Sequence, residues 1–194
     1  MGRHYLDHAS TSPARPEVVE AMLPWLTGEQ AADPGRVHTE GRMARAAVEH
    51  AREQVAALVG ARPREVVFTS GATEAVNAVA FGAGGPVACA RVEHSAVRDS
   101  GARHQVIDLA VDGHGRIDLA SVDAALAAGA RIVHCQWGNH EVGTVQPVAE
   151  VVQRCRARGE GVLVHVDAAQ AAGHVPIDFV GLGADLLSVS AHKL

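Results

Sequence analysis

The chain has 194 residues, 47% of them hydrophobic, so it can bury a sizeable core and does not have the composition of a disordered polymer. Its formal net charge of -5 and its 3% of aromatic residues argue against a nucleic-acid partner, which needs basic patches and stacking rings. No apolar run is long enough to cross a membrane, no signal-peptide core follows Met1, and the three cysteines are widely spaced. We therefore expect a reduced, cytoplasmic protein.

The first 40 residues predict a short N-terminal segment ahead of a larger domain over 41–194. Pro16 can open a helix over 17–26, which Gly28 would end, although Pro24 interrupts its last turn. The clearest helix of the sequence covers 41–59, because apolar residues recur there at steps of three and four, and Gly60 can end it.

Downstream of this helix, strand-like and helix-like stretches alternate. Short runs rich in β-branched residues predict buried strands over 66–69, 87–92, 105–109, 132–137, 162–166 and 186–189. Helical patterns lie between most of them, over 73–81, 95–100, 119–128 (with Asp118 as a candidate N-cap) and 148–158, and a Gly-rich turn at 112–116 can join short or antiparallel pieces. The alternation is typical of the α/β class, so we expect a mostly parallel sheet flanked by helices.

Polar residues follow five of the predicted strands. They occupy 69–73, 93–94, 137–141, 167–170 and 190–193. Because open α/β sheets bind ligands beyond the carboxyl ends of their strands, we expect these loops to line one pocket.

Two of these strand ends can hold an anion or a ring. Gly71 precedes a helix start at Ala72 and Thr73, whose N–H groups and hydroxyl can bind a phosphate. The competing interpretation is an ordinary helix capped by Ser70 or Thr73. His94 can stack on a planar cofactor and move protons, although taken alone a capping or surface histidine is the simpler interpretation.

Two further strand ends carry groups suited to amine and carbonyl chemistry. Asp167 can bind a metal, act as a base or pair with a protonated pyridine nitrogen. The competing interpretation is that Asp167 is a helix N-cap. Gln170 is expected to face the same pocket. Lys193 follows Ser190 and His192 and can form a Schiff base with an aldehyde once its pKa is lowered. A lone lysine at this place would be a solvated charge.

The remaining histidines and cysteines of interest predict core packing. His134 and His165 lie in neighbouring predicted strands, but no third ligand closes a metal set. Cys89 and Cys135 fall in predicted strands, and Cys155 lies in a predicted helix beside basic residues that can lower a thiol pKa. A packed thiol is the preferred interpretation for all three.

Taken together, these stretches resemble the NifS/IscS-type cysteine desulfurases of the class V aminotransferase group, pyridoxal-phosphate enzymes of fold type I. The matching stretches run in order across nearly the whole chain. They are YLDHA at 5–9, His38 with Gly41 and Arg42, FTSGATE at 68–74, EHSAV at 93–97, EVGTVQP at 141–147, HVDAAQ at 165–170 and DLLSVSAHK at 185–193.

The resemblance implies pyridoxal 5'-phosphate as cofactor and a role for each strand end. Lys193 would hold the cofactor as a Schiff base, Asp167 would keep its pyridine nitrogen protonated, and Gln170 would bond its phenolic oxygen. His94 would stack on the ring and move protons. The phosphate would be held by Thr73, Ser190, His192 and the backbone N–H of Ala72.

Two departures from the family pattern matter. His140 stands where the family has the second Asn of Asn-Asn-Glu, so a contact with cofactor or substrate falls to an imidazole whose proton state matters. The family also continues well beyond the lysine, with the cysteine that receives sulfur, the arginine that binds the substrate carboxylate, most of the small domain and an antiparallel strand of the sheet. The large domain of the pyridoxal-phosphate fold is therefore expected to be incomplete, with strand edges that invite another chain.

We therefore expect the cofactor-binding subunit of a split cysteine desulfurase. A complementary C-terminal-half polypeptide would supply the catalytic cysteine and the substrate-binding arginine, in a homodimer or heterotetramer. L-cysteine would give alanine and a persulfide, passed to a downstream sulfur acceptor. The alternatives are a catalytically silent interaction or regulatory protein, a fragment of a full-length desulfurase, and a related cysteine or selenocysteine lyase.

Overall fold

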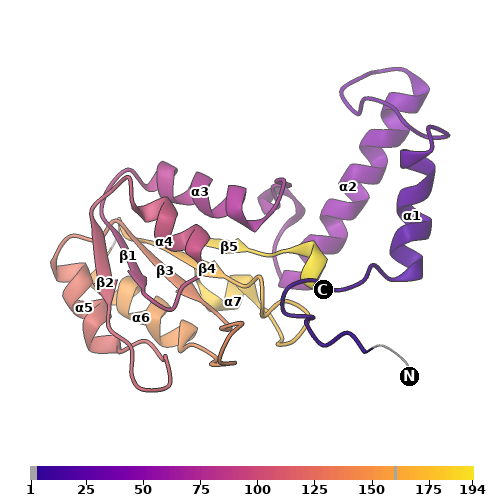
Figure 1. The fold of residues 1–194 in the computed structure, drawn as a ribbon. Helices are drawn as coiled ribbons and strands as arrows, with labels where there is room; N and C mark the ends of the chain where they lie inside the picture. The colour runs from indigo at the N-terminus through magenta and orange to yellow at the C-terminus, as the bar shows by residue number, and fades with distance from the viewer. Residues whose placement is uncertain (1–3, 160) are drawn as a thin grey trace. The chain divides into compact units, whose positions relative to one another are not determined.

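The computed structural model describes residues 4–159 and 161–194, which fall into two compact units. Unit 1 runs through Phe68, and unit 2 is Thr69–Leu194. Unit 2 contains the whole described sheet and all the predicted site residues (Figure 1). None of the helices in the described ranges combines the length and the apolar character needed to span a membrane.

Unit 1 consists of two helices and a short 3-10 turn. Helix α1 (Pro16–Leu26) continues through Pro24, and helix α2 (Thr39–Val59) ends at Gly60, whose φ of 67° suits glycine. The N-terminus of α2 is capped by the His38 ring, which accepts a hydrogen bond from the Gly41 N–H at 3.2 Å. The 3-10 turn η1 (Pro63–Glu65) follows.

The predicted strand at 66–69 is wrong, because these residues have irregular backbone. Arg52 of α2 donates a hydrogen bond to the Val66 carbonyl, and its guanidinium lies 5.1 Å from the centre of the Phe68 ring. Val67 is 78% exposed. The β-branched residues of this stretch thus have no neighbouring strand within unit 1, and a strand needs one to satisfy its backbone.

Unit 2 is built on a parallel sheet, as the alternation predicts. All neighbouring strands pair in parallel, in the order β2-β1-β3-β4-β5. The strands are β1 (Val87–Ala90), β2 (Val106–Leu109), β3 (Ile132–Gln136), β4 (Leu163–Asp167) and β5 (Leu186–Ser188).

Helices cover both faces of this sheet (Figure 1). One face carries α3 (Ala72–Ala83) and α4 (Ser95–Gly101), and the other carries α5 (Leu119–Ala127) and α6 (Val148–Arg158). The short helix α7 (Phe179–Leu182) and the 3-10 turn η2 (Ala191–Lys193), absent from the sequence prediction, complete unit 2.

The main hydrophobic core lies between the sheet and the pair α5 and α6. Val133 and Cys135 of β3 pack there with Val151 of α6, and all three are fully buried. Burial of each side chain of this size contributes about 1.5–3 kcal/mol relative to exposure.

Two loop predictions are confirmed in unit 2. Val111 and Ile117 form an isolated antiparallel bridge around the turn at 112–116. Asp118 caps α5 by accepting a hydrogen bond from the Ala120 N–H at 2.9 Å.

Candidate active site

Polar side chains form a row at the carboxyl ends of three strands. Asp167, the last residue of β4, is in register with Gln136 of β3 on one side and Ser188 of β5 on the other. Side chains alternate along a strand, so these three share the face covered by α3 and α4. Ser188 and Gln136 are buried, and Asp167 is partly buried.

Asp167 is held in place by its own turn and by β5. Its Oδ1 accepts hydrogen bonds from the Ala169 N–H at 2.9 Å and from the Ser188 hydroxyl at 3.3 Å. Its carbonyl accepts from the Trp137 N–H at 2.8 Å, which ties β4 to the loop after β3. Oδ1 of Asp167 thus serves a turn rather than the helix that the capping interpretation expects, because residues 169–174 form turns.

The loop after β1 carries His94 at the start of α4. The His94 side chain is exposed, and its Nδ1 accepts a hydrogen bond from the Ala96 N–H at 3.1 Å. The capping role is therefore real, and it places the ring proton of the neutral imidazole on Nε2. The centre of the His140 ring, from the loop after β3, lies 5.7 Å from that of His94 at an interplanar angle of 54°. The structure thus brings these two imidazoles together.

The loops after β1 and β3 are joined by buried hydrogen bonds. The carbonyl of Val92 accepts from the side-chain amides of Gln136 at 2.8 Å and Asn139 at 3.1 Å. Glu93, 3% exposed, accepts from the Gln136 N–H at 2.7 Å. Burial raises the pKa of Glu93 to about 8 against the lowering effect of this hydrogen bond, and the charge of Asp167 raises it further. Glu93 was predicted only as one of the polar residues at a strand end, although an acid directly after a buried strand is a signal for a function.

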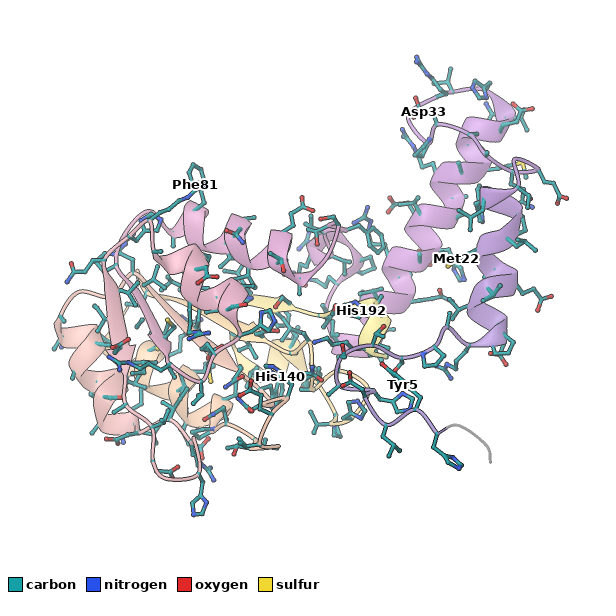
Figure 2. The ribbon with its side chains drawn as sticks, viewed as in Figure 1. Tyr5, Met22, Asp33, Phe81, His140 and His192 are labelled. Atoms are coloured by element: carbon teal, nitrogen blue, oxygen red, sulfur yellow. The ribbon has the colours of Figure 1, made fainter. Side chains whose placement is uncertain are left out.

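The residues after β5 place the lysine in a short turn. Ser190 is buried, and its Oγ lies 3.1 Å from Nδ1 of His192. Lys193 is partly buried in η2 and makes no ion pair within residues 4–159 and 161–194. It is also the single lysine of the whole sequence, beside 16 arginines. Figure 2 shows His192 in the turn at the end of β5 and His140 in the loop region of the same unit.

Gln170 belongs to the turn that follows β4. It is partly buried, and a Cβ built on Gly138 would lie 3.8 Å from the Gln170 carbonyl oxygen. The turn after β4 and the loop after β3 therefore lie against each other.

The start of α3 is not capped by a side chain. Its N-cap is Gly71, and neither Ser70 nor Thr73 makes a capping hydrogen bond, so the capping interpretation of these two residues is wrong. Glu74 accepts a hydrogen bond from the Ser70 N–H at 2.6 Å. Hydrogen bonding to Ser70, first to its side chain and then to its N–H, holds the pKa of Glu74 below its usual value. Ala72 and Thr73 lie in the first turn of α3, where backbone N–H groups attract anions. The side chain of Thr73 is exposed.

The three cysteines are buried thiols without disulfides. Burial raises the pKa of Cys89 to about 12 and that of Cys155 to about 11, and it raises the pKa of Cys135 well above its ordinary value. The prediction of packed thiols is confirmed, and the basic neighbours of Cys155 do not lower its pKa overall because burial outweighs them.

His134 and His165 form a fully buried pair rather than part of a metal site. Their Nδ1 atoms are 2.8 Å apart, and within the described residues both Nε2 atoms are buried without a hydrogen-bond partner. Burial lowers the pKa of His134 to about 4, and burial and then His134 lower the pKa of His165 well below its usual range. In the described part of the chain no three potential ligands gather around a metal position.

A parallel sheet whose strand ends carry an acid, two imidazoles and a lysine has the kinds of groups that bind pyridoxal phosphate. The family model for class-V aminotransferases matches residues 4–194, and the chain belongs to that family.

The relatives of the chain are cysteine desulfurases. It is 41% identical to cysteine desulfurase IscS of Salmonella arizonae, and the match covers 98% of this chain and 50% of that relative. It is also 41% identical to cysteine desulfurase IscS of Dechloromonas aromatica, over 97% of this chain and 49% of that relative. Among solved structures, a NifS-like protein matches with a TM-score of 0.93 at 32% identity, covering 99% of this chain and 56% of that one. SspA in complex with cysteine matches with a TM-score of 0.90 at 31% identity, over 97% and 57%. The chain thus spans about half the length of the curated relatives it matches.

Class-V aminotransferases and desulfurases of this type depend on pyridoxal 5'-phosphate. The described residues fit this group. Asp167 offers a carboxylate for a ring nitrogen, and Lys193 offers an amine for the aldehyde. The start of α3, which no side chain caps, offers backbone N–H groups for the phosphate. The buried Oε2 of Glu93 also has no hydrogen-bond partner among the described residues.

Proposed function

We propose that unit 2 is the cofactor-binding half of a cysteine desulfurase, an enzyme that takes sulfur from L-cysteine. The single observation that carries this proposal is the pairing of strand ends β4 and β5. Asp167 is in register with Ser188, and the sole lysine of the chain follows Ser188 by five residues. A carboxylate and a single amine at adjacent strand ends are the two groups that the cofactor requires.

Each strand end would then have a role in binding the cofactor or in the reaction. Lys193 would hold the cofactor covalently through Nζ and, once displaced by substrate, would use the free amine to move the proton at the substrate Cα. Asp167 would hold a proton on the ring nitrogen, Gln170 would bond the phenolic oxygen, and His94 would stack on the ring. When bound, pyridoxal phosphate supplies a ring that withdraws electrons from the substrate Cα.

The phosphate end would be held by the helix start and the last turn. The Ala72 N–H, the Thr73 hydroxyl and the groups of Ser190 and His192 are donors of the kind that bind phosphate. The contact between Ser190 and His192 supports this arrangement, because it places the two side chains within 3.1 Å of each other.

His140 would act beside His94 at the cofactor or substrate. Their rings are 5.7 Å apart, so a proton on one changes the charge felt by the other. We propose that His140 makes the contact that an asparagine makes in relatives of this kind, with a pH dependence that an amide would lack.

The sulfur-receiving cysteine would come from a complementary C-terminal half. Burial raises the pKa of Cys89 to about 12 and of Cys155 to about 11, and that of Cys135 further, so none offers a thiolate at neutral pH. The complementary half would also bring the arginine for the substrate carboxylate. It could be a second polypeptide, in a homodimer or heterotetramer, or a continuation of the same one.

Exposed apolar and strand-edge surface supports the need for that half. Among the described residues β5 pairs only with β4, which leaves its other edge open. Helix α1 buries none of its residues, and Leu26 there is 73% exposed. Phe81 is 75% exposed and projects from α3 away from the sheet (Figure 2). The open edge of β5 is a template for pairing with another chain.

The first experiment tests the cofactor. The purified chain, alone and with candidate complementary halves, is incubated with pyridoxal phosphate, reduced with borohydride and digested. Because Lys193 is the only lysine, the label should appear on one peptide and vanish in K193A. Labelling confined to the N-terminal amine, with or without the complementary half, would refute the proposal.

The second experiment tests the reaction. Alanine and sulfide released from L-cysteine are measured for the chain alone, for the chain with the complementary half, and for K193A with that half. We expect turnover only in the second mixture. Ordinary turnover by the chain alone would refute the need for a complementary half, and labelling without turnover in any mixture would favour a catalytically silent protein.

A further inference from the structure

Glu93 is the most deeply buried acid at the sheet edge, and its geometry is fixed from two sides. Its Oε1 accepts a hydrogen bond from the Gln136 N–H at 2.7 Å, and its own N–H donates to the Ala90 carbonyl at 3.1 Å. Gln136 is the register partner of Asp167. Glu93 therefore lies at the junction of β1 and β3, where the strand order reverses, one strand away from Asp167.

The second oxygen of Glu93 has no partner. Its Oε2 is buried and makes no hydrogen bond to any described residue, while the whole side chain is 3% exposed. An ionised carboxylate that is buried with one bonded oxygen is far more costly than the neutral acid. Burial is the largest cause that raises the pKa of Glu93 to about 8, and this agrees with the geometry.

The charges around Glu93 come from neighbouring strands. Asp167 of β4 raises its pKa, and Cys89 of β1 and Cys135 of β3 are buried thiols that feel its charge. The hydrogen bond from the Gln136 N–H opposes these effects but is outweighed by burial.

We propose that Glu93 is a positioning residue of the cofactor site, which carries a proton in the free protein and gives up part of it when a cationic ring nitrogen lies beside Asp167. Its bond to Gln136 fixes the loop that carries His94 against β3. This inference rests on the proposed function, because it assigns Glu93 a role toward the same bound ring.

The proposal predicts coupling between this proton and the cofactor. A cationic ring nitrogen beside Asp167 adds a positive charge close to Glu93, and an opposite charge lowers the pKa of an acid. Loading should therefore lower the pKa of Glu93. By linkage, part of the Glu93 proton should leave the protein on loading near pH 7.5.

The first test follows the carboxyl carbons by NMR in protein labelled with 13C at glutamate Cδ. The signal missing from E93Q identifies Glu93, and E150Q, at an exposed position of α6, is the matched control. We expect the Glu93 signal of the free chain to titrate near pH 8. A midpoint below about 6 would overturn the proposal, because the acid would then be ionised at neutral pH.

The second test repeats the titration after loading with pyridoxal phosphate, together with the complementary half if loading requires it. We expect the midpoint of Glu93 to fall and the parent to release more protons on loading than E93Q does. E93Q, which keeps the acceptor oxygen and a neutral shape, should bind the cofactor within about threefold of the parent. An unmoved midpoint, or equal proton release by parent and E93Q, would overturn the coupling.

The two levels of failure can be told apart. If no cofactor binds, the proposed function fails and the role toward the ring fails with it, whatever the titration of the free chain shows. If the cofactor binds and the Glu93 signal is already ionised, only the inference about Glu93 fails.

Discussion

The buried pair of His134 and His165 should make unit 2 sensitive to mild acid. Both rings are fully buried, their Nδ1 atoms are 2.8 Å apart, and one of these nitrogens must lack a proton to accept the bond. Protonating either ring would place an unpaired charge in the core. The perturbation we consider is His134→Gln, which removes one titrating group and keeps a polar side chain of similar size.

The size of the effect follows from the pKa of His134. Unfolded histidine takes up a proton below about pH 6.5, whereas the folded protein resists protonation of His134 down to about pH 4. The folded state therefore loses stability as the pH falls through this window. Between about pH 7.5 and pH 5.0 the loss from this one group is about 2 kcal/mol. Glu93 acts in the opposite sense over the same range, because its pKa is raised from 4.5 to about 8.

Urea unfolding at several pH values measures this loss. In a W25F background Trp137, at the end of β3, reports on unit 2 alone. Because Glu93 titrates alike in parent and variant, the difference between the two free energies of unfolding reports on His134 together with its effect on the pKa of His165. That difference should shift in favour of H134Q by about 2 kcal/mol from pH 7.5 to pH 5.0. H174Q, at an exposed position, is the control, and its free energy of unfolding should change with pH as that of the parent does. A pH-dependent difference below about 0.5 kcal/mol between H134Q and the parent would refute the reasoning.

Three further results are expected in unit 2. Q146A removes two buried hydrogen bonds to backbone groups and should lower the free energy of unfolding by about 2 kcal/mol in urea melts; an unchanged midpoint would contradict the role of this side chain. Asp185 accepts from the Val164 N–H at 2.7 Å and from Arg156 at 2.6 Å, so D185A should cost about 1–2 kcal/mol, with most of it recovered in D185N, which keeps an acceptor. Because burial raises the pKa of Cys89 to about 12, its thiol should react with a disulfide reagent at pH 8 only after urea is added, and prompt reaction in the folded protein would be evidence against this packing.

The sheet was predictable because burial on both faces leaves a clear pattern. Strands β1, β2, β3 and β5 lie within predicted apolar runs, β4 extends its predicted run by Asp167, and the helices between them follow their own periodicity. The stretch 66–69 has the same composition and is not a strand, because pairing depends on a neighbour that composition does not reveal. Helix α7, which is four residues long with Asp178 as its cap, is too short to show a period.

The site was predictable at its strand ends and not in the contacts between them. Asp167 and Lys193 stand out in sequence because a polar residue follows an apolar run. Gln136 does not, because it lies inside the predicted strand 132–137, and its importance lies in bonds to Val92 and Glu93. The proximity of His94 and His140 likewise results from the order of strands, which local sequence does not specify.

Alternation along β3 and β4 explains why stability and chemistry can coexist in so small a sheet. Val133 and Val164 face α5 and α6 in an apolar core, while their neighbours His134 and His165 face the other side. Two residues further on, that other side ends in the polar row of Asp167. Substitutions on the α5 and α6 face should therefore change stability without altering the site, whereas polar substitutions one residue along the same strands should affect both, because the buried histidine pair lies on the same face as Asp167, two residues before the end of each strand.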